Sequence, residues 1–341
     1  MNYPIISICI PSYNRPNEIN RLLNSIDCNT LDIEVVICDD KSPKRDEIKS
    51  TVDSFKRFSA YSVKYFENSS NKGFDGNLRR LINYAKGEYI LFMGDDDEFV
   101  PSELDKFIYF IKQNRDKPYI LRSYIVKHFD GKVEYFRYLP KTQILPAGET
   151  SVAWLIKRSV TISGFTISKK KALKFKTRHL DGTLLYQVYL MAQICLKNKS
   201  IYYHRPFVQC TQGFRKDNSM FGISKSEKNR YTTGIISDDN SINFTKAYFE
   251  ITSYLDNIHG TNLSKLVRFE LSKYSYPFLS IQRKHGILNF WNYTKRLEKE
   301  VKLDCTIYFH LYKWSLIFFG EKFCDRVIMF IKRIVGYTPH L

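Results

Sequence analysis

The feature that most constrains the fold is the alternation of strand-like and helix-like segments through residue 114. Short apolar runs typical of buried strands alternate with segments whose apolar residues recur at helical spacing. The order predicts an α/β domain with a mostly parallel central sheet, in which ligands bind beyond the carboxyl ends of the strands. The expected strands are 5–13, 33–40, 61–68 and 89–93, and the expected helices are 17–26, 46–58, 76–87 and 101–114.

Polar and acidic residues follow three of these four strands. The groups are Tyr13-Asn14-Arg15, Asp39-Asp40 and Asp95-Asp96-Asp97, the last followed by Glu98. Because parallel strands deliver their carboxyl ends to one crevice, we expect these groups to converge. The run of acids needs a positive partner, and adjacent carboxylates suit Mg²⁺ or Mn²⁺. Taken alone, the run is equally typical of a solvated turn that caps a helix.

Two common nucleotide-binding motifs are missing from the sequence. No G-x-G-x-x-G follows the first strand, and no G-x-x-x-x-G-K-[ST] occurs anywhere. A nucleotidyltransferase would need a glycine-rich, basic loop after the first strand, and "PSYNRPNE" lacks one. The crevice must therefore bind its ligand through a different motif.

An ordered set of motifs resembles the family 2 glycosyltransferases, which have the nucleotide-diphospho-sugar transferase (GT-A) fold. The motifs are "IPSYNR" (10–15), "EVVICDD" (34–40), "NKG" (71–73), Asn77 and "AKGEYILFMGDDDEFVP" (85–101). The resemblance covers about the first 100 residues well and extends more weakly to about residue 210. It implies an inverting enzyme of bacterial surface polysaccharide synthesis, in a lipopolysaccharide or O-antigen type of pathway.

The resemblance also implies roles for individual residues. Tyr13 is expected near the base of the nucleotide, where an aromatic ring stacks on a flat heterocycle, and Asp40 is expected to pair with the imide N–H of the base. Many relatives carry an acid where this chain has Gly94, so the division of work among the three acids stays open. The implied nucleotide-sugar-binding residues are Pro11, Tyr13, Arg15, Asp39, Asp40, Lys72, Asn77 and Asp95, and the implied ligands of Mn²⁺ or Mg²⁺ are Asp96 and Asp97.

The expected catalytic base is Asp181. Inverting transfer needs a carboxylate to take the proton of the acceptor hydroxyl, and in the resembled family this acid precedes a helix in the second half of the domain. Here Asp181 stands just ahead of an expected helix over 184–196, and no other acid lies between Glu149 and Asp217. The alternative role for Asp181 is an N-cap of that helix.

Composition and patterning divide the chain into three parts. We expect a GT-A catalytic domain over 1–212, a mobile loop or linker over 213–243 that closes over the site, and a helical, basic and aromatic region over 244–341. In that last region "DRVIMFIKRIVG" (325–336) places apolar residues on one helical face, with Trp314, Phe318 and Phe319 upstream. Such a helix either lies on an anionic membrane or packs on the catalytic domain, and both interpretations stay open.

Several bulk properties bear on location. The 341 residues carry a net charge of +18, which favours an anionic partner. The seven cysteines are scattered without zinc-site spacing, as expected of free thiols in a reducing compartment. Neither a signal sequence nor an apolar run of about 18 residues is apparent. We expect a cytoplasmic chain with peripheral contact to the inner face of the membrane.

The sequence thus predicts a metal-dependent inverting glycosyltransferase. Its expected donor is a nucleotide diphosphate sugar of the UDP-sugar type, and its acceptor is a saccharide or a lipid-diphosphate-linked saccharide. Two alternatives are a basic nucleic-acid-binding protein and a catalytically inactive GT-A scaffold. Nucleic acid is not an expected partner, because an acidic crevice repels phosphate unless a metal is bound.

Overall fold

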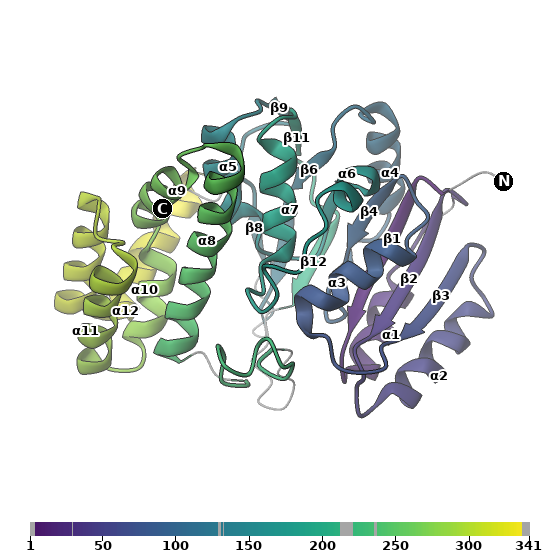
Figure 1. Ribbon diagram of the computed structural model, residues 1–341, viewed down its shortest axis with the longest axis horizontal. Coiled ribbons are helices and arrows are strands. Elements are labelled where there is room, and N and C mark those ends of the chain that lie inside the picture. The colour runs from purple at the N-terminus through teal and green to yellow at the C-terminus, as the bar shows by residue number, and fades with distance from the viewer. Residues whose placement is uncertain are drawn as a thin grey trace.

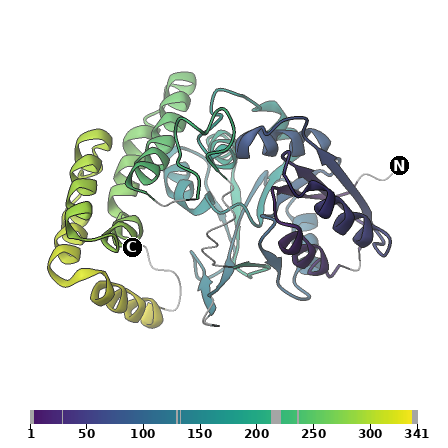
Figure 2. The same ribbon diagram turned by 90° about the horizontal axis from the view of Figure 1, so that it is seen from below.

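The computed structural model describes residues 4–28, 30–128, 131, 133–211, 221–234 and 237–335. An α/β unit that begins at the N-terminus occupies one end of the molecule, and a group of helices occupies the other end (Figure 1). The turned view in Figure 2 shows the same separation.

A central sheet of eight strands forms the α/β unit. Its strand order is β3-β2-β1-β4-β10-β6-β11-β9. The first four strands of the chain pair in parallel, whereas β10 runs antiparallel to both of its neighbours. The strands are β1 (Ile6–Ser12), β2 (Ile33–Asp39), β3 (Ser62–Glu67), β4 (Tyr89–Phe92), β6 (Tyr119–Arg122), β9 (Gln143–Leu145), β10 (Phe165–Ser168) and β11 (Ser200–Tyr203).

Helices cover both faces of this sheet. Apolar residues of α1, α2 and α4 pack on one face, and those of α3, α5, α6 and α7 pack on the other. Strands buried on both faces need apolar residues at every position, which explains the continuous apolar runs in the sequence. The helices are α1 (Pro16–Asn24), α2 (Arg45–Lys56), α3 (Gly73–Tyr84), α4 (Leu104–Gln113), α5 (Glu149–Ile156), α6 (Lys169–Lys174) and α7 (Tyr186–Cys195).

A second, smaller sheet lies beside the first and has the order β5-β12-β7-β8. β12 pairs in parallel with β7 and antiparallel with β5. Because β5 directly follows the acidic run, this sheet borders the expected site. Its strands are β5 (Glu98–Phe99), β7 (Tyr124–Lys127), β8 (Val133–Phe136) and β12 (Val208–Thr211).

The helical region begins earlier than the sequence predicts. Helix α8 starts at Asp238, inside the segment 213–243 expected to be a loop, because Ser237 caps it: its hydroxyl accepts a hydrogen bond of 3.1 Å from the amide of Asn240. The rest of the predicted loop falls partly on residues 213–220 and 235–236, which lie outside the described residues. The helices are α8 (Asp238–His259), α9 (Leu263–Lys273), α10 (Tyr276–Arg283), α11 (Ile287–Arg296) and α12 (Ile307–Val335).

Helix α12 contains a break at Gly320, whose φ of 71° lies in the left-handed region that favours glycine. Among the helices of the described residues, none combines the length and the apolar character needed to cross a lipid bilayer.

Candidate active site

The positive partner of the acidic run is Arg15. Its Nη1 atom lies 3.0 Å from Asp95 Oδ1 and 2.6 Å from Asp96 Oδ2. Asp95 is fully buried, and its Oδ2 atom also accepts a hydrogen bond of 3.2 Å from the amide of Tyr13. Ion pairs therefore join the turn after β1 to the turn after β4, as the convergence of strand ends predicts.

Burial sets the electrostatics of the acidic run. It raises the pKa of Asp95 to about 7, against the opposing effect of the Arg15 charge. Burial, and then the charge of Asp96, raise the pKa of Asp97 to about 6. Asp97 is turned into the protein, where its carboxylate accepts hydrogen bonds from the hydroxyl of Ser163 and, at 3.0 Å, from the amide of Thr211.

Gly94 fills the position where many members of the resembled family carry an acid. Its amide donates a 3.0 Å hydrogen bond to Ser163 Oγ. A Cβ atom at residue 94 would lie 3.1 Å from Asp96 Oδ1 and 3.1 Å from Ser163 Oγ. A side chain would fit here only if these neighbours shifted. In this chain, Asp96 and Ser163 occupy the space that the additional acid would need.

The donor set suits a divalent cation only in part. Among the described residues, no three His, Cys, Asp or Glu side chains gather into a set that could hold a metal ion. Mg²⁺ commonly takes one or two carboxylates, water and substrate phosphates. The side chain of Asp96 is 41% exposed and fits such a role, whereas Asp97 would first have to leave Ser163 and Thr211. The structure therefore favours Asp96 of the two predicted ligands.

Asp40 lies at the N-terminus of α3. Its carboxylate accepts hydrogen bonds from Asn68 Nδ2 at 2.8 Å, from the amide of Lys72 at 2.8 Å and from the amide of Gly73 at 2.9 Å. Burial raises the pKa of Asp40 to about 6, although these bonds favour the charged form. The neighbouring Asp39 accepts from the amide of Ser42 through Oδ1, while its buried Oδ2 atom has no hydrogen-bond partner.

The other predicted nucleotide-binding residues divide into exposed and internal groups. Tyr13 is half-buried, and burial followed by the charges of Asp40 and Asp39 raises its pKa. Lys72 is exposed and donates to Ser70. Pro11 and Asn77 are internal: Pro11 is a buried residue of β1 in register with β2, and the Asn77 amide donates 2.9 Å to the carbonyl of Cys38. Pro11 and Asn77 therefore belong to the protein interior that supports the site.

Asp181 lies in a separate, basic cavity of about 550 Å³. Its carboxylate pairs with both terminal nitrogens of Arg79, and the Nη2–Oδ2 distance is 2.6 Å. Lys72 connects this cavity to the Asp40 cluster, because its side chain lines the cavity and its amide binds Asp40. The cavity is lined by Lys72, Gly76, Arg79, Arg80, Asn83, Lys176, Thr177, Arg178 and Asp181.

Asp75 positions the loop that carries Asp181, a role that the sequence did not suggest. This fully enclosed carboxylate accepts hydrogen bonds from the amides of Gly182, Leu184 and Tyr186 at 2.9, 3.0 and 3.0 Å. Burial raises its pKa to about 7. Since α7 begins at Tyr186, Asp75 caps this helix from another helix of the fold, which no local pattern reveals.

Replacing Asp75 with asparagine is expected to lower the free energy of unfolding by about 1 to 3 kcal/mol, because an amide nitrogen then faces a backbone N–H in a buried site. Urea unfolding followed by circular dichroism measures the loss. The matched control is Asp53→Asn on the exposed face of α2, where only a solvent-exposed ion pair with Lys49 is lost and no measurable loss is expected. Equal losses in the two variants would contradict the capping role.

Glu227 is a second residue that the sequence did not suggest. It is buried, and its Oε1 atom accepts a 2.8 Å hydrogen bond from the amide of Phe74 at the start of α3. A Cβ atom on Gly73 would lie 2.5 Å from Ser224 Oγ, so residues 221–234 press closely on this helix end. This described part of the predicted loop is thus next to Asp40. Closure of the loop stays a prediction.

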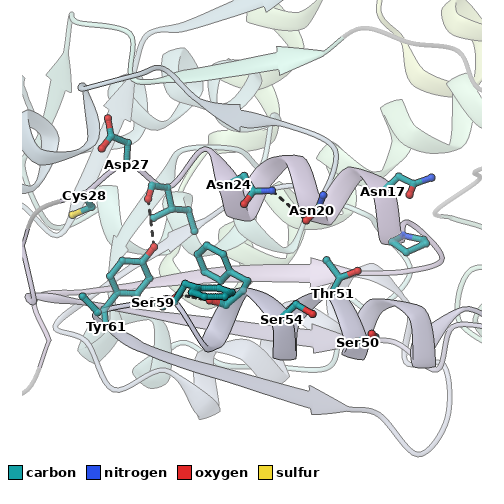
Figure 3. Close-up of a pocket in the computed structure, with 15 residues that line it drawn as sticks. Asn17, Asn20, Asn24, Asp27, Cys28, Ser50, Thr51, Ser54, Ser59 and Tyr61 are labelled. Carbon is teal, nitrogen blue, oxygen red and sulfur yellow. Dashed lines mark hydrogen bonds between the residues drawn. The ribbon is translucent and has the colours of Figure 1, made fainter.

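A groove of about 700 Å³ between α1 and α2 contains none of the predicted site residues (Figure 3). Figure 3 shows Asn17, Asn20 and Asn24 along α1, with Ser50 and Ser54 on α2 opposite. Apart from Asp27 and the thiol of Cys28, its polar groups are neutral amides and hydroxyls, so the groove offers no positive charge for a diphosphate. We therefore assign the chemistry to the carboxyl ends of the strands and not to this groove.

Comparisons with known proteins bear on the family and the fold of this domain. Residues 7–175 match the family "Glycosyl transferase family 2". A GalNAc(5)-diNAcBac-PP-undecaprenol beta-1,3-glucosyltransferase of Campylobacter jejuni is 27% identical over 240 residues, which are 65% of this chain and 69% of the relative. The abequosyltransferase RfbV of Salmonella typhimurium is 35% identical over 103 residues, but these are only 29% of this chain and 30% of the relative.

A solved structure of TarS 1-349 from S. aureus in complex with UDP-GlcNAc has the same fold. Its TM-score is 0.54 at 17% identity, with 89% of this chain and 76% of that chain covered. The expected GT-A fold with a helical C-terminal region is therefore confirmed. Residues 7–175 therefore form a domain of glycosyl transferase family 2, and the relatives named above are bacterial glycosyltransferases.

Proposed function

We propose that the chain transfers a sugar, with inversion, from a UDP-sugar to the hydroxyl of a saccharide acceptor. The observation that carries this proposal is the convergence at one sheet edge of two sites. One is the Tyr13 and Asp40 cluster, suited to a nucleoside. The other is the Arg15, Asp95 and Asp96 cluster, suited to a diphosphate. The proposed UDP class rests on the family resemblance.

The residues divide the work as follows. The ring of Tyr13 stacks on the base, and Asp40, held by three N–H donors, accepts the N–H of the base. Arg15 offsets part of the negative charge of Asp95 and Asp96 where the diphosphate leaves, and electrostatic stabilisation at such a point is commonly the largest part of catalysis. Mn²⁺ or Mg²⁺ held by Asp96 would neutralise the departing diphosphate when bound. Asp181 takes the proton of the acceptor hydroxyl.

A panel of nucleotide sugars tests the proposal. Each donor is incubated with the protein and Mn²⁺, and release of nucleoside diphosphate is measured. We expect slow hydrolysis of one donor, and we expect chelator or Asp96→Asn to remove it. Asp53→Asn, an exposed acid of α2 paired with Lys49, serves as the charge-matched control and retains the activity. Absence of release and of nucleotide binding with every donor would refute the transferase and favour an inactive scaffold.

The acceptor is proposed to be lipid-linked and presented at a membrane. The Campylobacter relative is named for a saccharide linked to PP-undecaprenol. In this chain, α12 exposes large apolar side chains that the fold leaves uncovered, and α11 and α12 lie at the end of the molecule away from the N-terminus (Figure 1). The exposed aromatic face of α12 consists of Trp314, Phe318, Phe319, Phe323 and Phe330. Aromatic residues together with basic ones are typical of helices that bind anionic membrane surfaces.

Replacing both Phe318 and Phe319 with aspartate is expected to reduce binding to vesicles of anionic lipid at least tenfold. These side chains are 73% and 63% exposed, and burying each in the membrane would contribute roughly 1.5 to 3 kcal/mol. Vesicle co-sedimentation measures the change. Phe58→Asp is the control, because Phe58 is 91% exposed on the catalytic domain. If the wild-type protein does not bind vesicles and sediments as a dimer, the exposed aromatic face of α12 joins two copies of the chain. The membrane proposal then fails.

A further inference from the structure

A second cavity lies where the catalytic domain meets the C-terminal helices. Its volume is about 330 Å³, near the lower end of the range of roughly 300 to 1,000 Å³ for small-molecule sites. Most of the lining is aromatic, with two cations and two hydroxyl groups among the rings. The lining residues are Tyr124, Phe136, Tyr138, Lys157, Arg158, Ser241, Phe244, Thr245, Tyr248, Leu271, Tyr274, Pro277 and Phe278.

The two cations are held unusually deep for charged groups. Arg158 is 4% exposed, and its guanidinium carbon lies 3.9 Å from the centre of the Trp154 ring and 5.5 Å from that of Tyr274. The ammonium of Lys157 lies against the face of Tyr274, and this buried nitrogen has no hydrogen-bond partner. Protonating this buried amine without an acceptor is costly, and an anion that enters the cavity would remove this cost.

The nearby charges leave the cavity positive. The charged groups that act on Lys157 are Arg158 beside it in the chain and Glu270 and Lys273 from α9. Glu270 is the one acid among them, and its buried Oε2 atom has no hydrogen-bond partner. Glu270 therefore does not saturate Lys157, and a further anion has room to bind.

A short chain of contacts joins this cavity to the acidic run. The guanidinium of Arg122 donates to the carbonyl of Ser163 at 2.9 Å and to that of Arg158 at 3.5 Å. The hydroxyl of Ser163 in turn donates to Asp97. The cavity is thus built onto the segment that supports the expected diphosphate site, on the side of the catalytic domain that faces the C-terminal helices.

We propose that this cavity binds the anionic group of the acceptor, a sugar ring that carries a phosphate or a carboxylate. The aromatic walls suit the apolar faces of one sugar ring, Ser241 and Thr245 can bind its hydroxyl groups, and Lys157 and Arg158 pair with its anion. The volume excludes a nucleotide diphosphate sugar, which the catalytic site binds elsewhere. The acceptor role rests on the proposed transferase function, whereas the binding of an anionic sugar does not.

The protonation of Lys157 supplies a specific signature. Burial, and then the charge of Arg158, lower the pKa of Lys157 to about 5, so the free side chain is neutral at pH 7. A bound anion favours the ammonium form, and binding at pH 7 therefore takes up a proton. The affinity for the anionic sugar should rise by up to about tenfold for each unit by which the pH falls from pH 8 to pH 6.

The test is calorimetric titration of the full chain with glucose 1-phosphate, glucuronic acid and neutral glucose, in two buffers of different ionisation heat. We expect an anionic sugar to bind with proton uptake and glucose not to bind, and the tighter of the two anions identifies the acceptor group. Lys157→Met should weaken binding at least tenfold and abolish proton uptake. Lys49→Met removes the same charge from the exposed face of α2, away from the cavity, and should bind as the wild type does.

Three results would overturn the proposal: equal binding of charged and neutral sugars, binding of none of them, or wild-type affinity in Lys157→Met. If Lys157 only pairs with Glu270, then Lys157→Met and Glu270→Gln lower thermal stability alike and no sugar binds. Because these titrations contain no donor, they are independent of the nucleotide-sugar assay. Failure of donor hydrolysis refutes the transferase, and failure of anion binding refutes this site alone.

Discussion

Replacing Arg15 with methionine is expected to lower the free energy of unfolding by about 3 to 5 kcal/mol at pH 8. The guanidinium is the ion-pair partner of Asp95, which is fully buried. Removing one member of a buried pair leaves the other charge uncompensated, and this is far more damaging than the loss of a surface pair. Urea unfolding at several pH values measures the effect.

The pH dependence follows from the pKa of Asp95, which burial raises to about 7 even with Arg15 present. A carboxyl group with a raised folded pKa stabilises the protein most below its unfolded pKa of about 3.9, and that contribution is lost as the pH rises through the folded pKa. Without Arg15 the pKa of Asp95 rises further, so the loss continues to higher pH. The gap between wild type and variant should therefore widen from pH 6 to pH 8.

Arg21→Met is the matched control. Arg21 lies on the neighbouring helix α1 and pairs with Glu98 at 3.2 Å, but both side chains are about a third exposed. We expect a loss of about 1 kcal/mol or less, without the widening toward pH 8. Equal losses for Arg15 and Arg21, or a gap that does not depend on pH, would show that Asp95 does not depend on Arg15.

The first half of the sheet was predictable because its strands are buried on both faces. β1, β2 and β4 are continuous apolar runs, and helices with clear apolar spacing separate them. The second half was not predicted, since the order of β10, β6 and β11 in the sheet departs from their order in the chain. Periodicity identifies a strand but does not reveal its neighbour.

The site, too, was predictable from the sequence only in part. Convergence of the strand ends followed from parallel pairing, and the acids and Arg15 do meet. The resemblance implies a nucleotide-binding role for Arg15, and the structure shows that it also neutralises Asp95 and Asp96. That contact depends on the register between β1 and β4. The contacts of Ser163 with Asp97 and of Asp75 with Tyr186 join residues 66 and 111 positions apart. No local pattern signals such pairs.

Asp181→Asn is expected to lower the rate of nucleoside diphosphate release by about 10² to 10⁴, the usual contribution of a general base. Donor binding should be unchanged, since the nucleotide and diphosphate clusters do not include this residue. The assay is the donor hydrolysis described above, with water as the acceptor, over a range of donor concentrations. A loss in kcat without a change in KM is the signature of a group that acts on the reacting proton.

The ion pair with Arg79 makes a sharper test possible. Both terminal nitrogens of the Arg79 guanidinium occupy the Asp181 carboxylate, so the base must be released from Arg79 to reach the acceptor hydroxyl. Arg79→Met imposes that release, and we expect it to keep or raise kcat while Asp181→Asn abolishes it. If the pair only stabilises the loop before α7, the two variants will instead lose thermal stability and activity to the same extent. Asp181 would then be a structural residue, and the base would have to be sought among the acids at the carboxyl ends of the strands.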